Sequence, residues 1–129
     1  MKQAGQRRLQ MLVASTVSLI GDGPLGLPME SMFGPEVAQL RAEGESLSEV
    51  SCLADRRQDV RRFLPTFREL TRLMAQFARY QSIDSLLITV NPRHVKFYTH
   101  YLGFVPISRR ITDCPHVENH PAVALRLEF

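Results

Sequence analysis

The feature that most constrains the fold is a continuous apolar run, Leu86 to Val90, between two segments with helical patterning. The run is rich in Leu, Ile and Val and carries no charge, which is typical of a strand covered on both faces. Strands of this kind occur mainly in α/β proteins, where helices lie on both sides of the sheet. The sequence therefore predicts an α/β fold in which residues 85–91 form an inner strand.

Helical periodicity is clearest over residues 65–81, where apolar side chains recur at three- and four-residue spacing. Pro65 suits the first turn of this helix, because a proline deeper inside would remove a backbone hydrogen bond. We expect the helix to pack on the sheet through one apolar stripe, formed by Phe67, Leu70, Met74 and Phe77.

Two shorter helices are predicted from their boundaries. Gly103 is a typical stop for a helix over 94–102. Pro35 suits the first position of a helix over 35–43, and Gly44 follows its end.

The remaining segments complete one mixed sheet. Residues 21–34 are rich in turn formers and are expected to be a loop. The predicted order is strand, helix, strand, helix, strand, helix, strand, strand, within a single domain over 1–129 in which 1–12 has no clear assignment. The strands expected to share the sheet are 13–20, 47–54, 85–91, 104–107 and 122–128.

Composition excludes several classes of protein. The chain is 44% hydrophobic and 22% charged, which indicates a globular domain rather than a disordered one. No apolar run reaches the roughly 18 residues that a membrane span needs. Two cysteines, Cys52 and Cys114, do not suggest a disulfide framework, so we expect a reduced, cytoplasmic setting.

Positive charge is concentrated in one segment. Residues 56–79 contain seven arginines against only Asp59 and Glu69, although the whole chain has a net charge of +3. A local positive field favours an anionic partner such as a phosphate group, an acidic protein or a nucleic acid. A solvated helix face is the alternative explanation of the same pattern.

The segment Val90–Phe104, VNPRHVKFYTHYLGF, resembles the strand–Asn–helix–"FY…GF" ending of GNAT acyltransferases. The resemblance implies a GNAT-like mixed sheet flanked by helices, with Asn91 at the edge of the cofactor site. In that superfamily a tyrosine on this helix often protonates the leaving thiolate. Tyr98 or Tyr101 would carry this role, although a tyrosine on an amphipathic helix is also a common core residue.

A second segment, Ser48–Ala54 (SEVSCLA), resembles the E-x-S-R-[FL]-A strand of acyl-homoserine-lactone and N-acyl amino acid synthases. The resemblance implies that Glu49 lies at the acceptor amine as a base or orienting group. Cys52 stands where that pattern often has an arginine. A carboxylate in a short, mostly apolar strand needs a partner or a task if it is buried.

The loop Asp22–Met29 (DGPLGLPM) and the segment Glu36–Gly44 (EVAQLRAEG) resemble the N-acyl amino acid synthase branch in particular. That family normally begins with a strand, two helices and another strand. Only about a dozen residues precede Val13, fewer than the ~30 of one βαβ unit. We therefore expect a fragment or a shortened member of the family, truncated at its N-terminus.

The expected donor site departs from that of ordinary GNAT enzymes. Those enzymes cradle the coenzyme A pyrophosphate with the backbone of a glycine-rich loop, whereas residues 56–62 (RRQDVRR) contain no glycine. Arg57, Arg61 and Arg62 would contact phosphate instead. The resembled branch is thought to use acyl carrier protein, which is acidic and carries a 4′-phosphopantetheine arm, so this partner is expected alongside coenzyme A as an alternative donor.

The resemblance implies an N-acyltransferase that moves a long-chain acyl group from such a thioester to the amine of an amino acid or a similar small molecule. No permanently bound cofactor is implied. Glu49 would accept the amine proton, and Ser51 and Cys52 would lie beside the acceptor. Strand amides near Leu53 and Ala54 would hold the pantetheine arm and polarise the thioester carbonyl.

Two other functions compete with this reading. Metal-dependent glyoxalase and dioxygenase modules also contain an "FY…LGF" segment, and a cluster of potential ligands, Cys114, His116, Glu118 and His120, occurs late in the chain. The spacing of these residues matches no standard zinc site. A non-catalytic, basic nucleic-acid-binding module would use the arginines of 56–79, but no recognition motif accompanies them.

Overall fold

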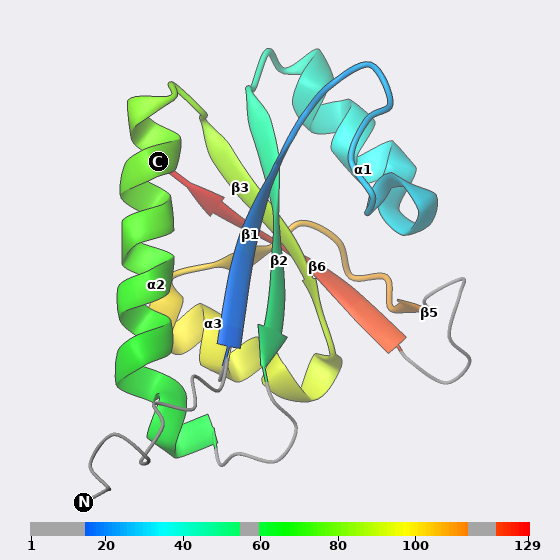
Figure 1. The fold of residues 1–129 in the computed structure, drawn as a ribbon. Helices are drawn as coiled ribbons and strands as arrows, with labels where there is room; N and C mark the ends of the chain where they lie inside the picture. Colours follow the sequence, from blue (N-terminus) through cyan, green and yellow to red (C-terminus); the bar gives the residue numbers. More distant parts are fainter. Residues whose placement is uncertain (1–14, 55–59, 114–120) are drawn as a thin grey trace, which may run out of the picture.

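The computed structural model describes residues 15–54, 60–113 and 121–129, which form an α/β fold around one mixed sheet (Figure 1). The described strands are β1 (Ser15–Gly21), β2 (Leu47–Ala54), β3 (Ser85–Val90), β4 (Val105–Pro106), β5 (Thr112–Asp113) and β6 (Pro121–Glu128). Their order is β1-β2-β3-β6-β4, and β5 also pairs with β6. β2 and β3 are parallel, and the other pairs are antiparallel. The five predicted strands therefore share one sheet, as expected.

Helices cover both faces of this sheet (Figure 1). Side chains alternate along β3, so that Leu87 packs with Phe33 on one face, whereas Leu86 packs with Met74 and Phe104 on the other. The prediction that β3 is an inner, doubly covered strand is confirmed. The helices are α1 (Glu30–Ala42) on the first face, and α2 (Val60–Tyr80) and α3 (Val95–Leu102) on the second, with a 3-10 turn, η2 (Pro92–His94), before α3.

The predicted start of α1 at Pro35 is wrong by five residues. A first helical turn begins at Glu30 and is interrupted at Phe33, whose φ of −127° and ψ of 39° are not helical. The helix then resumes, so Pro35 still lies just after a break, where its missing N–H is tolerated. The end of α1 agrees with the prediction, because Gly44 adopts a φ of +85° and its N–H donates to the carbonyl of Arg41.

α2 also begins earlier than predicted, at Val60, and Pro65 is its sixth residue rather than part of its first turn. The stripe that meets the sheet differs too. Met74 is buried as expected, but Phe77 is 54% exposed, so its predicted packing is wrong. Ala78, four residues after Met74, is buried in its place. The side chain of Phe67 lies outside the described residues.

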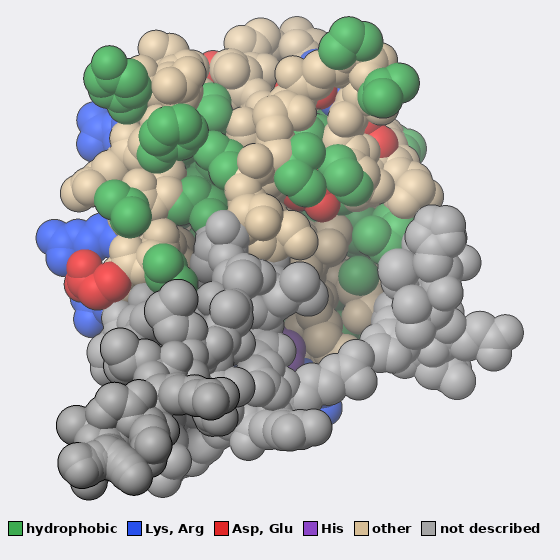
Figure 2. Space-filling view, viewed as in Figure 1, with side chains coloured by type: hydrophobic (Ala, Val, Ile, Leu, Met, Phe, Trp, Pro, Cys, Tyr) green, Lys and Arg blue, Asp and Glu red, His purple; other side chains and the backbone are tan. Residues whose placement is uncertain are grey.

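A second apolar stripe on α2 faces solvent. It follows the helical spacing of four and three residues and consists of Leu73, Phe77 and Tyr80. Figure 2 shows hydrophobic side chains gathered over α2, with basic side chains along its outer edge. The periodicity in the sequence thus reflects both a buried and an exposed stripe. Within the described part of the chain, no helix is long and apolar enough to span a membrane.

Candidate active site

The β2 and β3 strands separate part of the way along the sheet. Their parallel pairing covers only Leu47–Glu49 against Ser85–Leu87, although both strands continue beyond it. β2 remains paired with β1 along its other edge as far as Ala54. The edge of β2 that faces β3 is therefore unpaired by any described strand after Glu49. A gap therefore opens between these two strands, and Glu49 lies where the gap begins.

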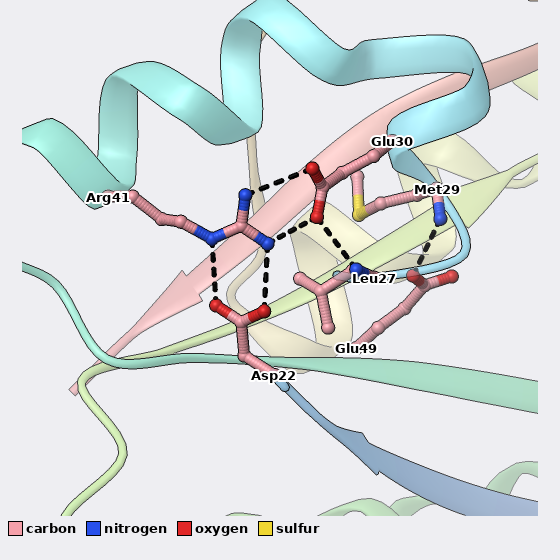
Figure 3. Close-up of polar contacts among 6 residues, drawn as sticks. All are labelled: Asp22, Leu27, Met29, Glu30, Arg41 and Glu49. Carbon is pink, nitrogen blue, oxygen red and sulfur yellow. Dashed lines mark hydrogen bonds and ion pairs between the residues drawn. The ribbon is translucent and has the colours of Figure 1, made fainter. Parts of the chain in front are cut away.

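Glu49 is the buried acid of this region. Its side chain is on the α1 face of the sheet, and the residue is only 6% exposed. Its Oε1 accepts a hydrogen bond of 2.8 Å from the backbone N–H of Met29 (Figure 3). Burial raises the pKa of Glu49 above its ordinary value; the Met29 N–H opposes the rise, and the negative charge of Glu30 adds to it.

Glu49 forms no ion pair with the described residues. Buried carboxylates that serve only the fold are normally paired with a cation. In this protein the carboxylate is held by one backbone amide, and its neighbours in the sheet, Ile20 and Leu87, are apolar. Glu49 can therefore act as a general base with a raised pKa at the point where β2 and β3 separate.

The loop that carries Met29 is fastened by a network of charged residues (Figure 3). The guanidinium of Arg41 binds Asp22 through two bonds of 2.8 Å and also binds both carboxylate oxygens of Glu30. Glu30 Oε1 in turn accepts the N–H of Leu27 at 2.7 Å. Hydrogen bonds from Arg41 lower the pKa of Glu30, and the Glu30 and Asp22 carboxylates raise that of Arg41.

Sequence reasoning missed Glu30 and Arg41. Both lie in or beside segments that carry the resemblance, but no short-range pattern links Arg41 to Asp22, which is 19 residues away.

The residues expected beside the substrate continue along β2. Ser51 is exposed and lies opposite Ser18 of β1. Cys52, Leu53 and Ala54 follow on the part of β2 whose gap edge is unpaired, and their side chains lie outside the described residues. The structure thus brings these four backbone positions and Glu49 together on one strand.

Tyr98 lies on the opposite face of the sheet from Glu49. It is half-buried on α3 and packs edge-on against Phe97 and Phe104, with ring centroids 5.3 and 5.9 Å apart. The structure therefore does not place Tyr98 beside Glu49, and its catalytic role stays a prediction. Tyr101, the alternative, is exposed.

Asn91 and His94 follow the end of β3, where the gap is open. Asn91 Oδ1 accepts the N–H of Arg93 at 3.1 Å and so caps η2. Sequence reasoning did not single out His94, which is half-buried; burial lowers its pKa, and the charge of Arg93 lowers it further.

The basic residues expected at the donor site are described only in part. Arg57 lies outside the described residues, and Arg61 and Arg62 lie in the first turn of α2 with side chains that are not described. Only residues 55–59 separate the end of β2 from the start of α2. The positive end of the α2 dipole and two arginines therefore belong to the same end of the sheet as the gap.

The alternative metal cluster, Cys114, His116, Glu118 and His120, lies outside the described residues. Among the residues that are described, no group of three or more His, Cys, Asp or Glu side chains is arranged to hold a metal ion.

A mixed sheet with helices on both faces, opened between two parallel strands beside a buried glutamate, defines a GNAT-like acyltransferase fold. Residues 8–128 match the family model of N-acyl amino acid synthase FeeM, and the chain belongs to this family. The solved structure of FeeM, an N-acyl amino acid synthase from uncultured soil microbes, is 34% identical with a TM-score of 0.72. The match covers 89% of this chain and 60% of that one, so this chain spans about three-fifths of the length of FeeM. No curated protein matches.

Proposed function

We propose that this protein is an N-acyltransferase that moves an acyl group, of long chain, from a thioester to the amine of an amino acid or a similar small molecule. The observation that carries the proposal is Glu49, a buried carboxylate without a cationic partner among the described residues, at the point where β2 and β3 separate. Membership of the N-acyl amino acid synthase family supports the same chemistry.

The reaction needs a neutral amine, because a protonated amine has no lone pair to attack a carbonyl carbon. Met29 occupies Glu49 Oε1, and no described residue hydrogen-bonds Oε2. Glu49 would accept the amine proton through Oε2, directly or through water, while the C–N bond forms. The C–S bond of the thioester then breaks, and the leaving thiolate takes up a proton. A raised pKa makes Glu49 a stronger base than an exposed glutamate.

The unpaired edge of β2 gives the thioester a place to bind. Its backbone groups near Leu53 and Ala54 pair with no described strand on the side of β3. An extended pantetheine arm could form hydrogen bonds with them, as an added strand does. A β2 amide directed at the thioester oxygen would stabilise the negative charge that develops during attack.

The proposal is tested by incubating the protein with a long-chain acyl carrier protein and a panel of amino acids. Mass spectrometry would detect the N-acyl product, and a thiol reagent would measure the released carrier thiol. Formation of both in equal amounts is the expected outcome. Thiol release without an N-acyl product would indicate thioester hydrolysis and would contradict the proposal.

The donor is proposed to be acyl carrier protein rather than free coenzyme A, with Arg57, Arg61 and Arg62 as the contacts to phosphate and acidic side chains. Replacing all three by alanine is expected to weaken carrier-protein binding by on the order of tenfold or more at low salt. The difference should shrink as salt is added, because exposed charges are screened. Calorimetry at two salt concentrations would measure both effects.

Arg79→Ala is the matched control, since Arg79 is exposed at the far end of the same helix. This variant should bind carrier protein as the wild type does. Tight binding of free coenzyme A that ignores Arg57→Ala and Arg61→Ala would contradict the donor assignment and leave the acyl transfer itself untouched.

A further inference from the structure

The loop between β1 and α1 is held against Glu49 by its backbone. Two N–H groups, two residues apart, end on two different carboxylates: Leu27 donates to Glu30 at 2.7 Å, and Met29 donates to Glu49 at 2.8 Å. Both residues are buried, so the loop packs over the sheet at this point. The position of the Met29 N–H therefore depends on whatever fixes the loop on either side.

Arg41 fixes both sides of the loop at once (Figure 3). It reaches from the last turn of α1 to Asp22, at the start of the loop, and to Glu30, at its end. The planar guanidinium provides enough donors for two carboxylates, whereas a lysine ammonium cannot form both forked contacts. The side chains of Arg41, Asp22 and Glu30 are each between 23% and 33% exposed, so water screens them only in part.

The loop packs closely against Glu30 at Gly26. Gly26 has a φ of +76°, which disfavours other residues, and a Cβ atom added there would lie 2.6 Å from Glu30 Oε1. The loop thus lies in contact with the carboxylate that Arg41 binds.

We propose that Arg41 is a positioning residue for acyl transfer: it holds the Met29 N–H on Glu49 Oε1 and neutralises Glu30, so that Glu49 stays ionised with Oε2 directed to the acceptor. This inference rests on the proposed function of Glu49. Arg41 acts through the loop, since its described contacts are with Asp22 and Glu30 rather than with Glu49 itself.

Two other cations on this face are bound to carboxylates other than Glu49, and one of them, Arg110, pairs with Glu36 of α1. Arg126 of β6 lies one strand further away, opposite Leu87, and is bound to Glu45 and Glu128. The strand neighbours of Glu49 carry no charge. Among the described residues, the charge that acts on the pKa of Glu49 is that of Glu30, the carboxylate that Arg41 binds.

The two partners of this ion pair have opposite expected effects. Arg41→Gln leaves Glu30 unneutralised and loosens the Met29 N–H, and both changes raise the pKa of Glu49 further. Glu30→Gln removes the negative charge and keeps an oxygen for the Leu27 N–H, so the pKa of Glu49 falls. If the ion pair were purely structural, Arg41→Gln and Glu30→Gln would have effects of the same kind, and the pKa of Glu49 would not move in opposite directions.

The test combines kinetics with an independent structural signal. The pH dependence of kcat/KM would be measured for the wild type, Arg41→Gln, Arg41→Lys and Glu30→Gln, alongside the pH titration of the Met29 amide resonance by NMR. For Arg41→Gln we expect kcat/KM to be lower than in the wild type by roughly three- to tenfold on the acidic side of the pH profile, since a pKa change of one unit alters the ionised fraction tenfold there. At high pH, where Glu49 is ionised in both proteins, the two values should become equal. Arg41→Lys should lie between Arg41→Gln and the wild type, and Glu30→Gln should move the limb to lower pH.

Arg110→Gln is the matched control. Arg110 forms a similar forked pair with Glu36 of α1 and also donates to the carbonyl of Met32, but it contacts neither the loop nor Glu49. The Arg110→Gln variant should lower the melting temperature about as much as Arg41→Gln does. It should leave unchanged both the pH dependence of kcat/KM and the pH titration of the Met29 amide.

Each outcome separates this inference from the proposed function. If Arg41→Gln and Arg110→Gln lower stability alike and neither moves the Met29 titration, the positioning role of Arg41 is overturned, whatever the activity. If Met29 titrates as expected but Glu49→Gln retains full turnover, the loop contact stands and the proposed function of Glu49 fails. Should Arg41→Gln not fold, Asp22→Asn removes one anchor only and must shift the titration in the same direction.

Discussion

Glutamine in place of Glu49 is expected to lower kcat for N-acylation by about 10²–10⁴-fold, the usual range for the loss of a general base. Glutamine has nearly the same size and can still accept the Met29 N–H, but it cannot take up a proton. The measurement is N-acyl product formed per minute at saturating donor and acceptor. Unchanged turnover would remove Glu49 as the base and leave it an orienting or structural group.

The same substitution should preserve the fold and even stabilise it above acidic pH. Because burial raises the pKa of Glu49 in the folded state, the folded protein binds this proton more tightly than the unfolded chain. The stability that Glu49 contributes is thus present at low pH and declines as the pH rises from its unfolded pKa through its folded pKa. The free energy of unfolding of Glu49→Gln should therefore exceed that of the wild type above this range.

Glu45→Gln provides the matched comparison for that variant. Glu45 is another largely buried carboxylate, but it is paired with Arg126 at 2.5 Å. Losing this pair should lower stability at neutral pH and leave kcat within about twofold of the wild type. An equal loss of activity in both variants would indicate that the effect is one of folding.

Phe33→Ala is expected to cost about 3–5 kcal/mol of the free energy of unfolding. Phe33 is fully buried in the cluster between α1 and the sheet, at the break in α1, and the guanidinium of Arg110 lies 5.2 Å from its ring centre. Removing the ring leaves a cavity between α1 and the sheet, which the segments of α1 on either side of the break cannot fill. Urea denaturation, with the slope of unfolding checked for constancy, would measure the loss.

Phe77→Ala is the control for that experiment, because it removes the same ring from the exposed stripe of α2. Its effect should lie within about 0.5 kcal/mol of zero. Equal losses at the two positions would mean that the exposed stripe of α2 is covered in solution or that the α1 face contributes little to the core.

The strands could be predicted from the sequence because their signals are local. The apolar run of β3 and the turn residues around β2 mark elements whose neighbours along the chain already define them. The errors arose where tertiary contacts decide. The loop before α1 is bound to the sheet through Met29 and to Arg41 through Asp22, and α1 starts at Glu30, directly after it. α2 buries Ala78 rather than Phe77, and apolar periodicity alone does not decide between the two stripes.

The candidate site divides in the same way. Glu49 could be identified as a carboxylate in an apolar strand, and its face of the sheet follows from strand alternation. Its partner, the Met29 N–H, could not, because backbone groups leave no trace in residue identity and the contact spans 20 positions. The roles of Leu53, Ala54 and Arg57 stay predictions.

The short β2–β3 pairing has a consequence for how the chain folds. In the described strands, seven residue pairs join β1 to β2 and six join β3 to β6, whereas three join β2 to β3. Forming those three pairs requires closing the chain from Leu47 to Ser85. The pairing free energy of three residue pairs is small beside the loss of chain entropy on closure. We therefore expect the sheet to assemble as two antiparallel units that meet late, at the short β2–β3 pairing. We expect thermal fluctuations to separate the two units first at this same junction, beside Glu49.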